Sequence, residues 1–360
     1  MRRQDPLILG AGPAGCATAI ALARGGASPH LIERTRETGD ALCGGFLSWQ
    51  TLDRLDRLGV GGLEAHPIAE VRVFHRQQRA TARLPDLAIG VSRHRLDTVM
   101  QRVAIEAGAV LERGITARSY ADGILKTDSG DFAPEALFLA TGKHDVRGFG
   151  RPKPAGDAPM GLRIRLAPHP ALRKLLEHAI ELHLFEGGYA GLLLQEDDSA
   201  NLCMALRKSR FAEAGGDAAT LLRQLGDDHP QLGERLAFLS EAPAADAIAA
   251  VPYGWRTDST APGLFRLGDQ AAVIPSLAGE GMGIALASGA AAAAAFHAGG
   301  ADAAPDYQRR FAARSRRPVA VASMLWHQGE RPAMARLAVP LLNAFPALAG
   351  FAARLTRIGD

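Results

Sequence analysis

Apolar and polar positions alternate in short blocks at the start of the chain. An apolar run over residues 6–9 leads into glycines, and an alanine-rich stretch over 16–24 follows with the length of a helix. The pair Gly25-Gly26 ends that stretch, and a second apolar run occupies residues 30–33. Strand, helix and strand in this order predict a βαβ unit, and so the beginning of a parallel sheet.

The next part of the chain mixes helical and strand-like patterns. Residues 51–58 carry leucines at helical spacing, and Ser92 is a suitable N-cap for a helix that ends near Ala107. The other elements predicted here are a hairpin over 71–84 and a buried strand over 136–142 that leads into a turn.

From residue 161 the pattern becomes mainly strand-like. Residues 162–166 alternate between apolar and polar, which predicts a strand with one face toward solvent. The elements predicted after it are three antiparallel strands over 180–185, 190–195 and 201–206, and two helices over 217–225 and 231–239. This segment therefore predicts a second domain built on a sheet.

The chain then returns to the first pattern. Residues 264–269 predict a strand followed by a turn, and 283–297 predict a long alanine-rich helix. The last sixty residues have helical patterns, although Pro340 and Pro346 interrupt an apolar stretch over 337–355. The first domain is thus predicted to be discontinuous, with the second domain inserted into it.

The glycines after the first strand form a G-x-G-x-x-G turn. Gly10 allows the tight turn, Gly12 lets the backbone approach a pyrophosphate, and Gly15 lets the helix pack closely on the strand. Glu33 ends the second strand at the distance expected for an acid that hydrogen-bonds a ribose hydroxyl. Because an acid disfavours a 2′-phosphate, this site suits the ADP part of NAD or FAD.

A second glycine-rich segment lies far downstream. Asp269 follows Gly268 at the end of a predicted strand, where its carboxylate can bind a polyol hydroxyl. Gly279, Gly281 and Gly283 then alternate at the start of a helix, where the backbone can approach a flat ring and the positive end of the helix can stabilise an anion. One nucleotide explains only the first segment, whereas one large cofactor explains both.

Composition excludes several classes of protein. The 360 residues suffice for two interleaved domains, and the net charge of +3 gives no sign of nucleic-acid binding. The three cysteines are scattered, without a C-x-x-C pair or a Cys/His cluster, so we expect no disulfides and no metal site. Arg2 and Arg3 precede a nucleotide-binding strand rather than a signal peptide. These features predict a cytoplasmic location.

Both glycine segments resemble the FAD-binding motifs of the superfamily of FAD-dependent hydroxylases and reductases, which is typified by p-hydroxybenzoate hydroxylase and geranylgeranyl reductase. The resemblance covers the first 150 residues and about 254–299, and it includes Arg93 in a Ser-Arg-x-x-Leu-Asp motif near the pyrophosphate. It implies FAD as the cofactor. The residues expected to bind FAD are Gly10, Gly12, Pro13, Ala14, Gly15, Glu33, Arg34, Cys43, Gly44, Arg93, Gly142, Gly268, Asp269, Pro275, Gly279, Gly281 and Met282.

The predicted fold class is α/β, with a Rossmann-type FAD-binding domain, an inserted antiparallel-sheet substrate domain and C-terminal helices. The expected boundaries are 1–65, 85–150 and 254–300 for the FAD-binding domain, 66–84 and 151–253 for the substrate domain, and 301–360 for a helical cap.

Departures from the family patterns narrow the range of reactions that the chain is expected to catalyse. Residues 140–143 read Ala-Thr-Gly-Lys where hydroxylases usually carry Asp-Gly, the motif linked to NADPH. Its absence puts direct reduction by NADPH in doubt. The sequence therefore leaves open whether NADH or NADPH is the electron donor. The Trp-x-Trp-x-Ile-Pro segment of flavin halogenases is absent. We predict a monooxygenase of an apolar aromatic, polyketide or isoprenoid molecule. The alternatives are a reductase of isoprenoid-type double bonds, because Cys43-Gly44-Gly45 resembles the geranylgeranyl reductase branch, and a non-catalytic nucleotide sensor.

Two residues are candidates for catalysis, each with a structural alternative. Cys43 would gate the flavin or handle a proton beside it, or else is a small buried side chain. Glu280 would act as an acid or base, or else is a solvent-facing acid in a loop. Tyr189, Tyr253 and Trp255 either line the substrate cavity or belong to the core.

The expected partner is a hydrophobic small molecule, and the sequence leaves the oligomeric state open. The apolar stretch over 337–355, flanked by Arg336, Arg354 and Arg357, is either a cap over the substrate cavity or a shallow contact with a membrane.

Overall fold

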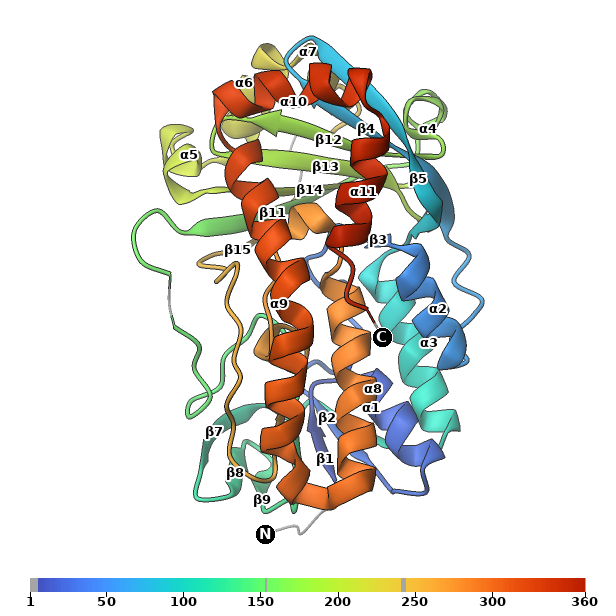
Figure 1. The fold of residues 1–360 in the computed structure, drawn as a ribbon, viewed down its shortest axis with the longest axis vertical. Helices are drawn as coiled ribbons and strands as arrows, with labels where there is room; N and C mark the ends of the chain where they lie inside the picture. Colours follow the sequence, from blue (N-terminus) through green and yellow to red (C-terminus); the bar gives the residue numbers. More distant parts are fainter. Residues whose placement is uncertain (1–5, 153, 241–243, 360) are drawn as a thin grey trace.

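The computed structural model describes residues 6–152, 154–240 and 244–359, so Arg2 and Arg3 lie outside the described residues. Two sheets are stacked along the long axis of the molecule, as Figure 1 shows. A smaller parallel sheet occupies the end nearer the N-terminus, and a larger sheet occupies the other end. The helix α9 (Ala304–Gly329) runs alongside both of them.

The parallel sheet has five strands in the Rossmann-like order β16-β10-β1-β2-β6. The strands are β1 (Leu7–Leu9), β2 (His30–Glu33), β6 (Val110–Arg113), β10 (Leu137–Leu139) and β16 (Leu264–Arg266). The strand β16 is paired with β10 in parallel although 124 residues separate Leu139 from Leu264, so distant parts of the chain contribute to this sheet.

Both faces of the parallel sheet are covered, which explains why its strands read as unbroken apolar runs. One face packs on α1 (Pro13–Arg24), α3 (Arg93–Glu106) and α8 (Gly281–Gly299). The other packs on a three-stranded sheet of β7 (Ala117–Ala121), β8 (Ile124–Thr127) and β9 (Gly130–Phe132), which the sequence pattern did not predict.

Serine caps begin two of the predicted helices. The Oγ of Ser92 accepts a hydrogen bond from the Arg95 N–H at 3.0 Å, which confirms the predicted cap of α3. Ser48 caps α2 (Trp49–Arg57) in the same way. Such a cap contributes about 1 kcal/mol because it satisfies an N–H that the helix itself leaves free.

The larger sheet has eight strands in the order β15-β11-β14-β13-β12-β4-β5-β3. They are β3 (Phe46–Leu47), β4 (His66–His75), β5 (Gln78–Gly90), β11 (Pro159–Leu166), β12 (Ala179–Phe185), β13 (Gly188–Leu194), β14 (Ala200–Arg207) and β15 (Ala245–Ile248). The predicted antiparallel set over 180–206 is confirmed, but β12 pairs with β4 in parallel, so the sheet is mixed. The hairpin of β4 and β5 is longer than predicted and brings residues 85–90 into this sheet.

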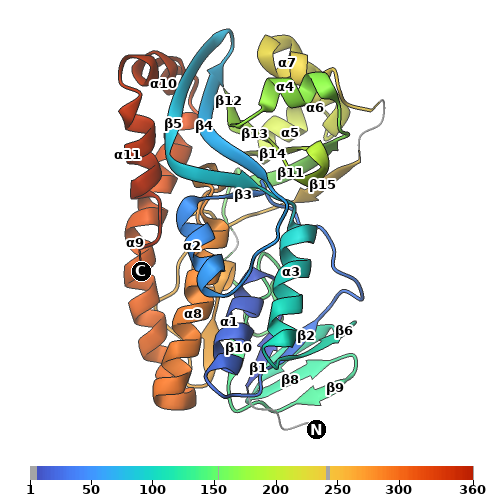
Figure 2. The ribbon, with the colours of Figure 1, turned by 90° about the vertical axis from the view of Figure 1, so that its right-hand side faces the viewer.

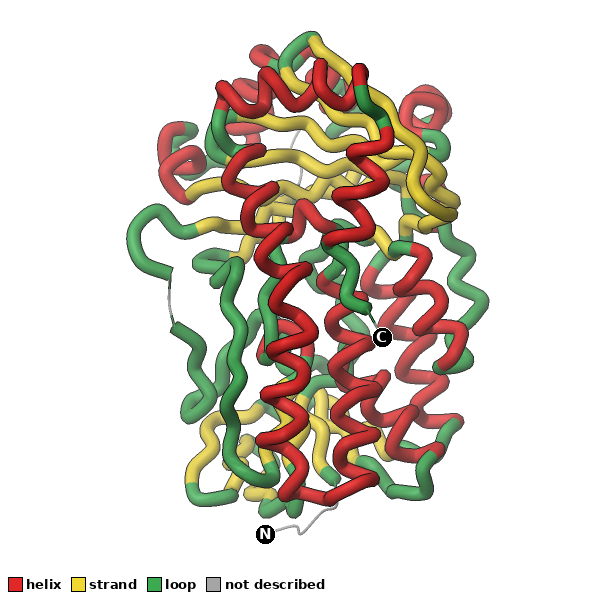
Figure 3. The backbone as a smooth tube through the Cα atoms, in the orientation of Figure 1, coloured by secondary structure: helices red, strands yellow, loops and turns green. Residues whose placement is uncertain are grey.

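Helices cover both faces of the larger sheet (Figures 2 and 3). On one side lie α4 (Pro170–Leu176), α5 (Lys208–Glu213), α6 (Ala218–Asp228) and α7 (Pro230–Leu236). On the other lie α9, α10 (Pro332–Ala344) and α11 (Ala347–Leu355), with Trp326, Ala335 and Val339 packed on the strands.

The predicted solvent-facing side of residues 162–166 is wrong for Arg163. This side chain is 7% exposed, and its Nη1 lies 2.6 Å from the Asp40 carboxylate. Its guanidinium also pairs with Asp246 on the neighbouring strand β15. The loop that precedes β3 covers this face, and a contact so distant in sequence leaves no trace in the local alternation.

One helical stretch, Gly281–Gly329, is long and apolar enough to cross a membrane by length and composition alone. Half of its most apolar 18-residue window is buried inside the fold. A Cβ added to Gly289 would lie 2.7 Å from the Ala14 carbonyl oxygen, which shows how closely α8 packs on α1. We therefore interpret α8 as a core helix.

Candidate active site

A single cavity of about 1080 Å³ lies between the two sheets. Its wall includes the β1–α1 turn, the loop that precedes β3, the ends of β10 and β16, the start of α8, and one face of the larger sheet. Pockets of about 300–1,000 Å³ hold one drug-sized ligand. This cavity is therefore large enough for an extended cofactor or for two ligands side by side.

The glycines of the first turn fit their predicted roles. A Cβ on Gly15 would lie 1.9 Å from the Gly10 carbonyl oxygen, so any larger residue would push α1 away from β1. Gly10 has a φ of +105°, and its Cβ would lie 2.6 Å from the Ala140 carbonyl oxygen. Gly12 differs, because only Arg93 Nη2 lies within 4 Å of its Cβ position, at 3.2 Å. The backbone at Gly12 is thus left open to a ligand.

The N-terminus of α1 faces this opening. No side chain caps the helix, and its first internal hydrogen bond runs from the Cys16 N–H to the Gly12 carbonyl oxygen at 2.9 Å. Pro13 and Ala14 of the first turn line the cavity. Free N–H groups and the helix dipole together favour an anion at this position.

Glu33 lies at the same end of the cavity. Its Oε2 accepts a hydrogen bond from the Ala11 N–H at 2.9 Å, and its Oε1 accepts one from the Thr35 N–H at 3.0 Å. Oε1 also accepts a hydrogen bond from the Thr35 hydroxyl at 3.1 Å, whereas Oε2 keeps a further acceptor position that a ribose hydroxyl can use. Arg34 lines the cavity beside it.

Arg93 places a fixed cation next to Gly12. Its Nε and Nη2 donate to the two oxygens of Asp97 at 2.9 and 2.7 Å, which is the bidentate geometry of a strong ion pair. Burial opposes the charge on Arg93, but Asp97 outweighs burial and the pKa of the guanidinium is raised. The cation therefore persists in the buried wall and suits the pyrophosphate contact that the sequence predicts.

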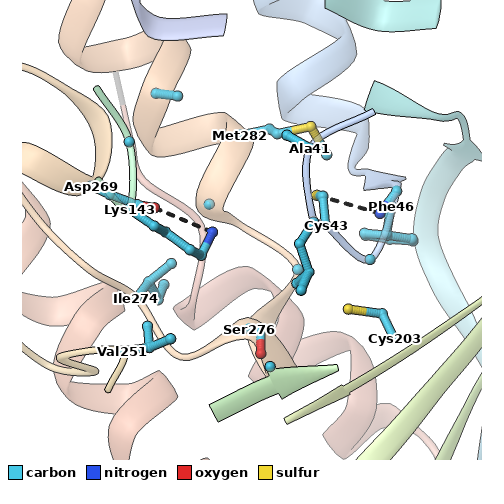
Figure 4. A pocket seen from close by; sticks show the side chains of 18 of the residues that line it. Ala41, Cys43, Phe46, Lys143, Cys203, Val251, Asp269, Ile274, Ser276 and Met282 are labelled. Carbon is cyan, nitrogen blue, oxygen red and sulfur yellow. Dashed lines mark hydrogen bonds and ion pairs between the residues drawn. The ribbon is translucent and has the colours of Figure 1, made fainter. Parts of the chain in front are cut away.

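The second glycine segment meets the first, as predicted. A Cβ on Gly268 would lie 3.4 Å from the Ala14 Cβ, and the Gly268 N–H donates to Ser288 Oγ of α8 at 2.8 Å. Asp269 lies 3.3 Å from Lys143 Nζ on the cavity wall (Figure 4). Asp269 raises the pKa of Lys143 and outweighs the opposing effect of burial. The two segments therefore form one binding surface.

The Cys43 loop lies across the cavity from the Lys143–Asp269 pair (Figure 4). Asn201, on β14 and 1% exposed, donates from Nδ2 to the carbonyl oxygens of Cys43 and Gly44 at 3.0 and 2.9 Å. This anchor fixes the Cys-Gly-Gly backbone on the sheet. The sequence reasoning missed Asn201, because a single Asn inside a strand carries no recognisable signal.

Two tyrosines and a serine form a hydrogen-bonded chain in the cavity wall. Tyr189 donates to Ser276 Oγ at 2.8 Å, and the Tyr253 hydroxyl lies 2.7 Å from the same oxygen. Burial raises the pKa of both phenols, so both stay protonated. Trp255 lies outside the lining of this cavity, and Ser276 was not predicted from the sequence.

Glu280 does not reach the cavity. Its side chain is 0% exposed, and its Oε2 accepts a hydrogen bond from Arg357 Nη1 at 2.8 Å. Its Oε1 accepts another from the Ile358 N–H at 3.1 Å. Neither a catalytic role nor the alternative of a solvent-facing acid agrees with this placement, because the carboxylate holds the C-terminal segment against the start of α8.

The remaining predicted residues fall into two groups. Gly15 and Pro275 lie outside the lining, Gly15 because it packs on β1 and Pro275 because it precedes the 3-10 turn Ser276–Ala278. Those that line the cavity are Gly10, Gly12, Pro13, Ala14, Glu33, Arg34, Cys43, Gly44, Arg93, Gly142, Gly268, Asp269, Gly279, Gly281 and Met282.

One part of the cavity wall, which we call the apolar arm, consists mainly of apolar side chains from the larger sheet and from α9 and α10. Val73, Leu182 and Leu184 contribute from the larger sheet. Leu325, Leu337 and Leu341 contribute from α9 and α10. No cluster of metal-binding side chains occurs in the described residues.

Comparison with known proteins agrees with this geometry. Residues 3–124 match the family model of the FAD binding domain. The chain is 26% identical over 326 residues to the menaquinone reductase of Mycolicibacterium smegmatis, which covers 83% of this chain and 77% of the relative.

Solved structures share the fold over almost the whole chain. A geranylgeranyl bacteriochlorophyll reductase-like protein from Thermoplasma acidophilum has a TM-score of 0.75 at 18% identity, covering 100% of this chain and 94% of that one. PqsL, a probable FAD-dependent monooxygenase from Pseudomonas aeruginosa, has a TM-score of 0.71 at 19% identity, covering 94% and 99%. The predicted fold class is therefore confirmed.

Proposed function

We propose that this chain, an FAD-dependent oxidoreductase, reduces a double bond in a long, isoprenoid-type substrate. Its N-terminal third matches an FAD-binding domain, and its fold is that of flavin monooxygenases and reductases. The observation that carries the proposal is the apolar arm, which joins the cofactor segments without a break.

The described residues fit FAD. Glu33 and the uncapped N-terminus of α1 suit the adenosine ribose and the pyrophosphate, with Arg93 as a further cation. Asp269 suits the ribityl hydroxyls, and the N-terminus of α8 at Gly281 has no side-chain cap and suits the anionic edge of the flavin ring.

The apolar arm supports the proposed class of substrate. Val73, Leu182 and Leu184 form a wall that offers no hydrogen bond to a polar substrate, whereas burial of a methylene is worth about 0.8 kcal/mol. A flexible hydrocarbon chain gains from each carbon that it places along such a wall. An isoprenoid chain satisfies this requirement and also presents a double bond.

Reduction of a carbon–carbon double bond needs a hydride and a proton. Bound FAD in its reduced form supplies the hydride. The chain of Tyr253, Ser276 and Tyr189 holds protons at two phenolic oxygens in the cavity wall. Cys43, which accepts a hydrogen bond at Sγ from the Gly45 N–H at 3.5 Å, is a second proton donor within the same cavity.

The relative supports reduction over oxygenation. The protein from Mycolicibacterium smegmatis is a menaquinone reductase, and the Cys-Gly-Gly segment at 43–45 resembles the geranylgeranyl reductase branch. Insertion of one oxygen atom into the same substrate is the second candidate, because the apolar lining of the cavity suits the same substrate in either reaction.

Product mass tests the proposal. The FAD-loaded protein, reduced by dithionite without oxygen, is mixed with a menaquinone that has a short isoprenoid tail, and the product is analysed by mass spectrometry. We expect a gain of two hydrogen atoms in the tail. A gain of one oxygen atom, seen only when air is admitted, would support the second candidate instead. A protein that binds FAD but leaves the menaquinone unchanged with and without air would support the alternative of a non-catalytic sensor.

Replacement of Ser276 by alanine is expected to lower kcat about tenfold while KM changes by less than about twofold, since general acid groups act on the chemical step. The substitution removes both hydrogen bonds that position the two phenols. Ser276→Thr keeps the hydroxyl and should restore the rate, and the exposed Ser129→Ala serves as the matched control. Equal rates in Ser276→Ala and the native protein would exclude this chain of groups from proton transfer.

A further inference from the structure

Two C-terminal helices expose an unusual amount of apolar surface. Of ten exposed large apolar side chains in the described residues, six lie on or between α10 and α11. They are Met334, Leu337, Leu341, Phe345, Leu348 and Phe351, and we call them the α10–α11 face. Phe345 and Phe351 are each 60% exposed. Exposure of so many neighbouring apolar side chains to water is unfavourable, and such a patch usually marks a surface that contacts a partner.

The cavity opens at this face. Leu337, Leu341 and Leu348 are 63%, 50% and 39% exposed, and the same three side chains line the cavity. The apolar arm therefore leads from the cofactor segments to the outside between α10 and α11. A hydrocarbon chain that enters here stays in apolar surroundings along its path.

The two helices lie along the surface of the molecule. Together they are apolar enough for a membrane span, but they are bent by 114° at the break between them. Ala335 and Val339, each 1% exposed, fix α10 to the larger sheet through its opposite side. In Figure 2 both helices belong to one outer layer of the molecule. This geometry suits helices that rest in a membrane interface rather than cross it.

The charge of the C-terminal segment over residues 331–359 also suits a membrane interface. Residues 331–359 contain four arginines and no Asp or Glu. Arg357 is buried against Glu280, whereas Arg331, Arg336 and Arg354 are exposed beside the apolar face. Apolar side chains bordered by arginines match the acyl region and the headgroups of an anionic bilayer.

We propose that the α10–α11 face docks on an anionic lipid bilayer and that the substrate enters the cavity from the bilayer between these helices. Entry of substrate rests on the proposed function, whereas docking does not.

Co-sedimentation with vesicles tests docking. The probe is vesicles of phosphatidylglycerol and phosphatidylethanolamine, mixed with the FAD-loaded protein, and vesicles of phosphatidylcholine alone are the comparison. The Phe345→Glu/Phe351→Glu variant changes two exposed residues that do not line the cavity. We expect it to bind anionic vesicles at least tenfold more weakly. Ile105→Glu/Val110→Glu, which alters exposed apolar residues on α3 and β6, is the matched control and should bind like the native protein.

Activity then separates docking from the proposed reaction. The Phe345→Glu/Phe351→Glu variant should turn over a short-tailed substrate in detergent at the native rate, but lose at least tenfold in rate with substrate embedded in vesicles. Native protein that fails to bind the anionic vesicles, or a variant that binds them equally well, would overturn the inference. So would a dimer that the variant dissociates, because the face would then belong to a second copy. Loss of the reaction with vesicle binding intact would refute the proposed function alone.

Discussion

Arg357→Met is expected to lower the free energy of unfolding by about 3–5 kcal/mol, because it leaves the buried Glu280 carboxylate without its cation. Arg357 Nη1 lies 2.8 Å from Glu280 Oε2 and also donates to the Ala278 carbonyl oxygen at 2.8 Å. Its guanidinium lies over the Trp49 ring at 5.2 Å from the ring centre. Urea unfolding of the FAD-loaded and FAD-free protein measures the loss.

The sign of the pH dependence gives an independent check. Burial raises the pKa of Glu280, and Arg357 only partly offsets it. In Arg357→Met the folded state should therefore bind a proton more readily than the unfolded state. It follows that the variant regains stability as the pH falls from 7 toward 5. A loss that is independent of pH would mean that packing, and not the orphaned charge, causes the destabilisation.

Two controls isolate the ion pair. Arg354→Met removes a neighbouring exposed arginine and should cost less than about 0.5 kcal/mol. Glu280→Gln/Arg357→Met removes both charges and should be more stable than Arg357→Met, because no buried charge is left alone. If the double variant is as unstable as Arg357→Met, the explanation through Glu280 is wrong.

The Glu280 pair shows where prediction from sequence fails. The glycines on both sides of Glu280 correctly indicate a backbone close to the ligand, and Gly279 and Gly281 both line the cavity. The partner that decides the role of Glu280 lies 77 residues away. No local pattern links the two positions, so an acid in a glycine loop looks catalytic although it is structural.

The parts that were predicted correctly depend on local physics. Gly10 has a positive φ of +105° in the first turn, and Gly15 packs on the Gly10 carbonyl oxygen within the same βαβ unit. Ser92 caps a helix through a residue three positions away. The alanine-rich composition of residues 283–297 likewise predicted α8, and the strand pattern with its turns predicted the set β12–β14. Each of these signals lies within one element or between neighbouring elements in the chain.

Contacts between distant segments account for the rest. Arg163 is buried only because the loop that contains Asp40 folds over its face of the sheet. Asn201 anchors the Cys43 loop from a strand that lies 158 residues downstream. Polar residues in such positions look like ordinary surface residues until the sheet order is known.

Gly12→Asp is expected to weaken FAD binding by at least about a hundredfold while the chain still folds, since like charges in contact cost several kcal/mol. Gly12 has a φ of −81° and ψ of −171°, an extended conformation that any residue adopts. Its Cβ position is open apart from Arg93 Nη2 at 3.2 Å. A carboxylate there occupies the place of the pyrophosphate and competes for Arg93 and the N-terminus of α1.

Gly15→Ala separates this effect from a simple failure to fold. Its Cβ would meet the Gly10 carbonyl oxygen at 1.9 Å, so it should lower the free energy of unfolding as well as FAD affinity. Flavin fluorescence titration and urea unfolding, run on both variants, distinguish the two positions. Gly12→Asp should lose affinity with nearly native stability, whereas Gly15→Ala should lose both. Native affinity in Gly12→Asp would place the pyrophosphate elsewhere and remove the basis of the cofactor site, because Glu33, Arg93 and the N-terminus of α1 were assigned to FAD on the assumption that the pyrophosphate lies at this turn.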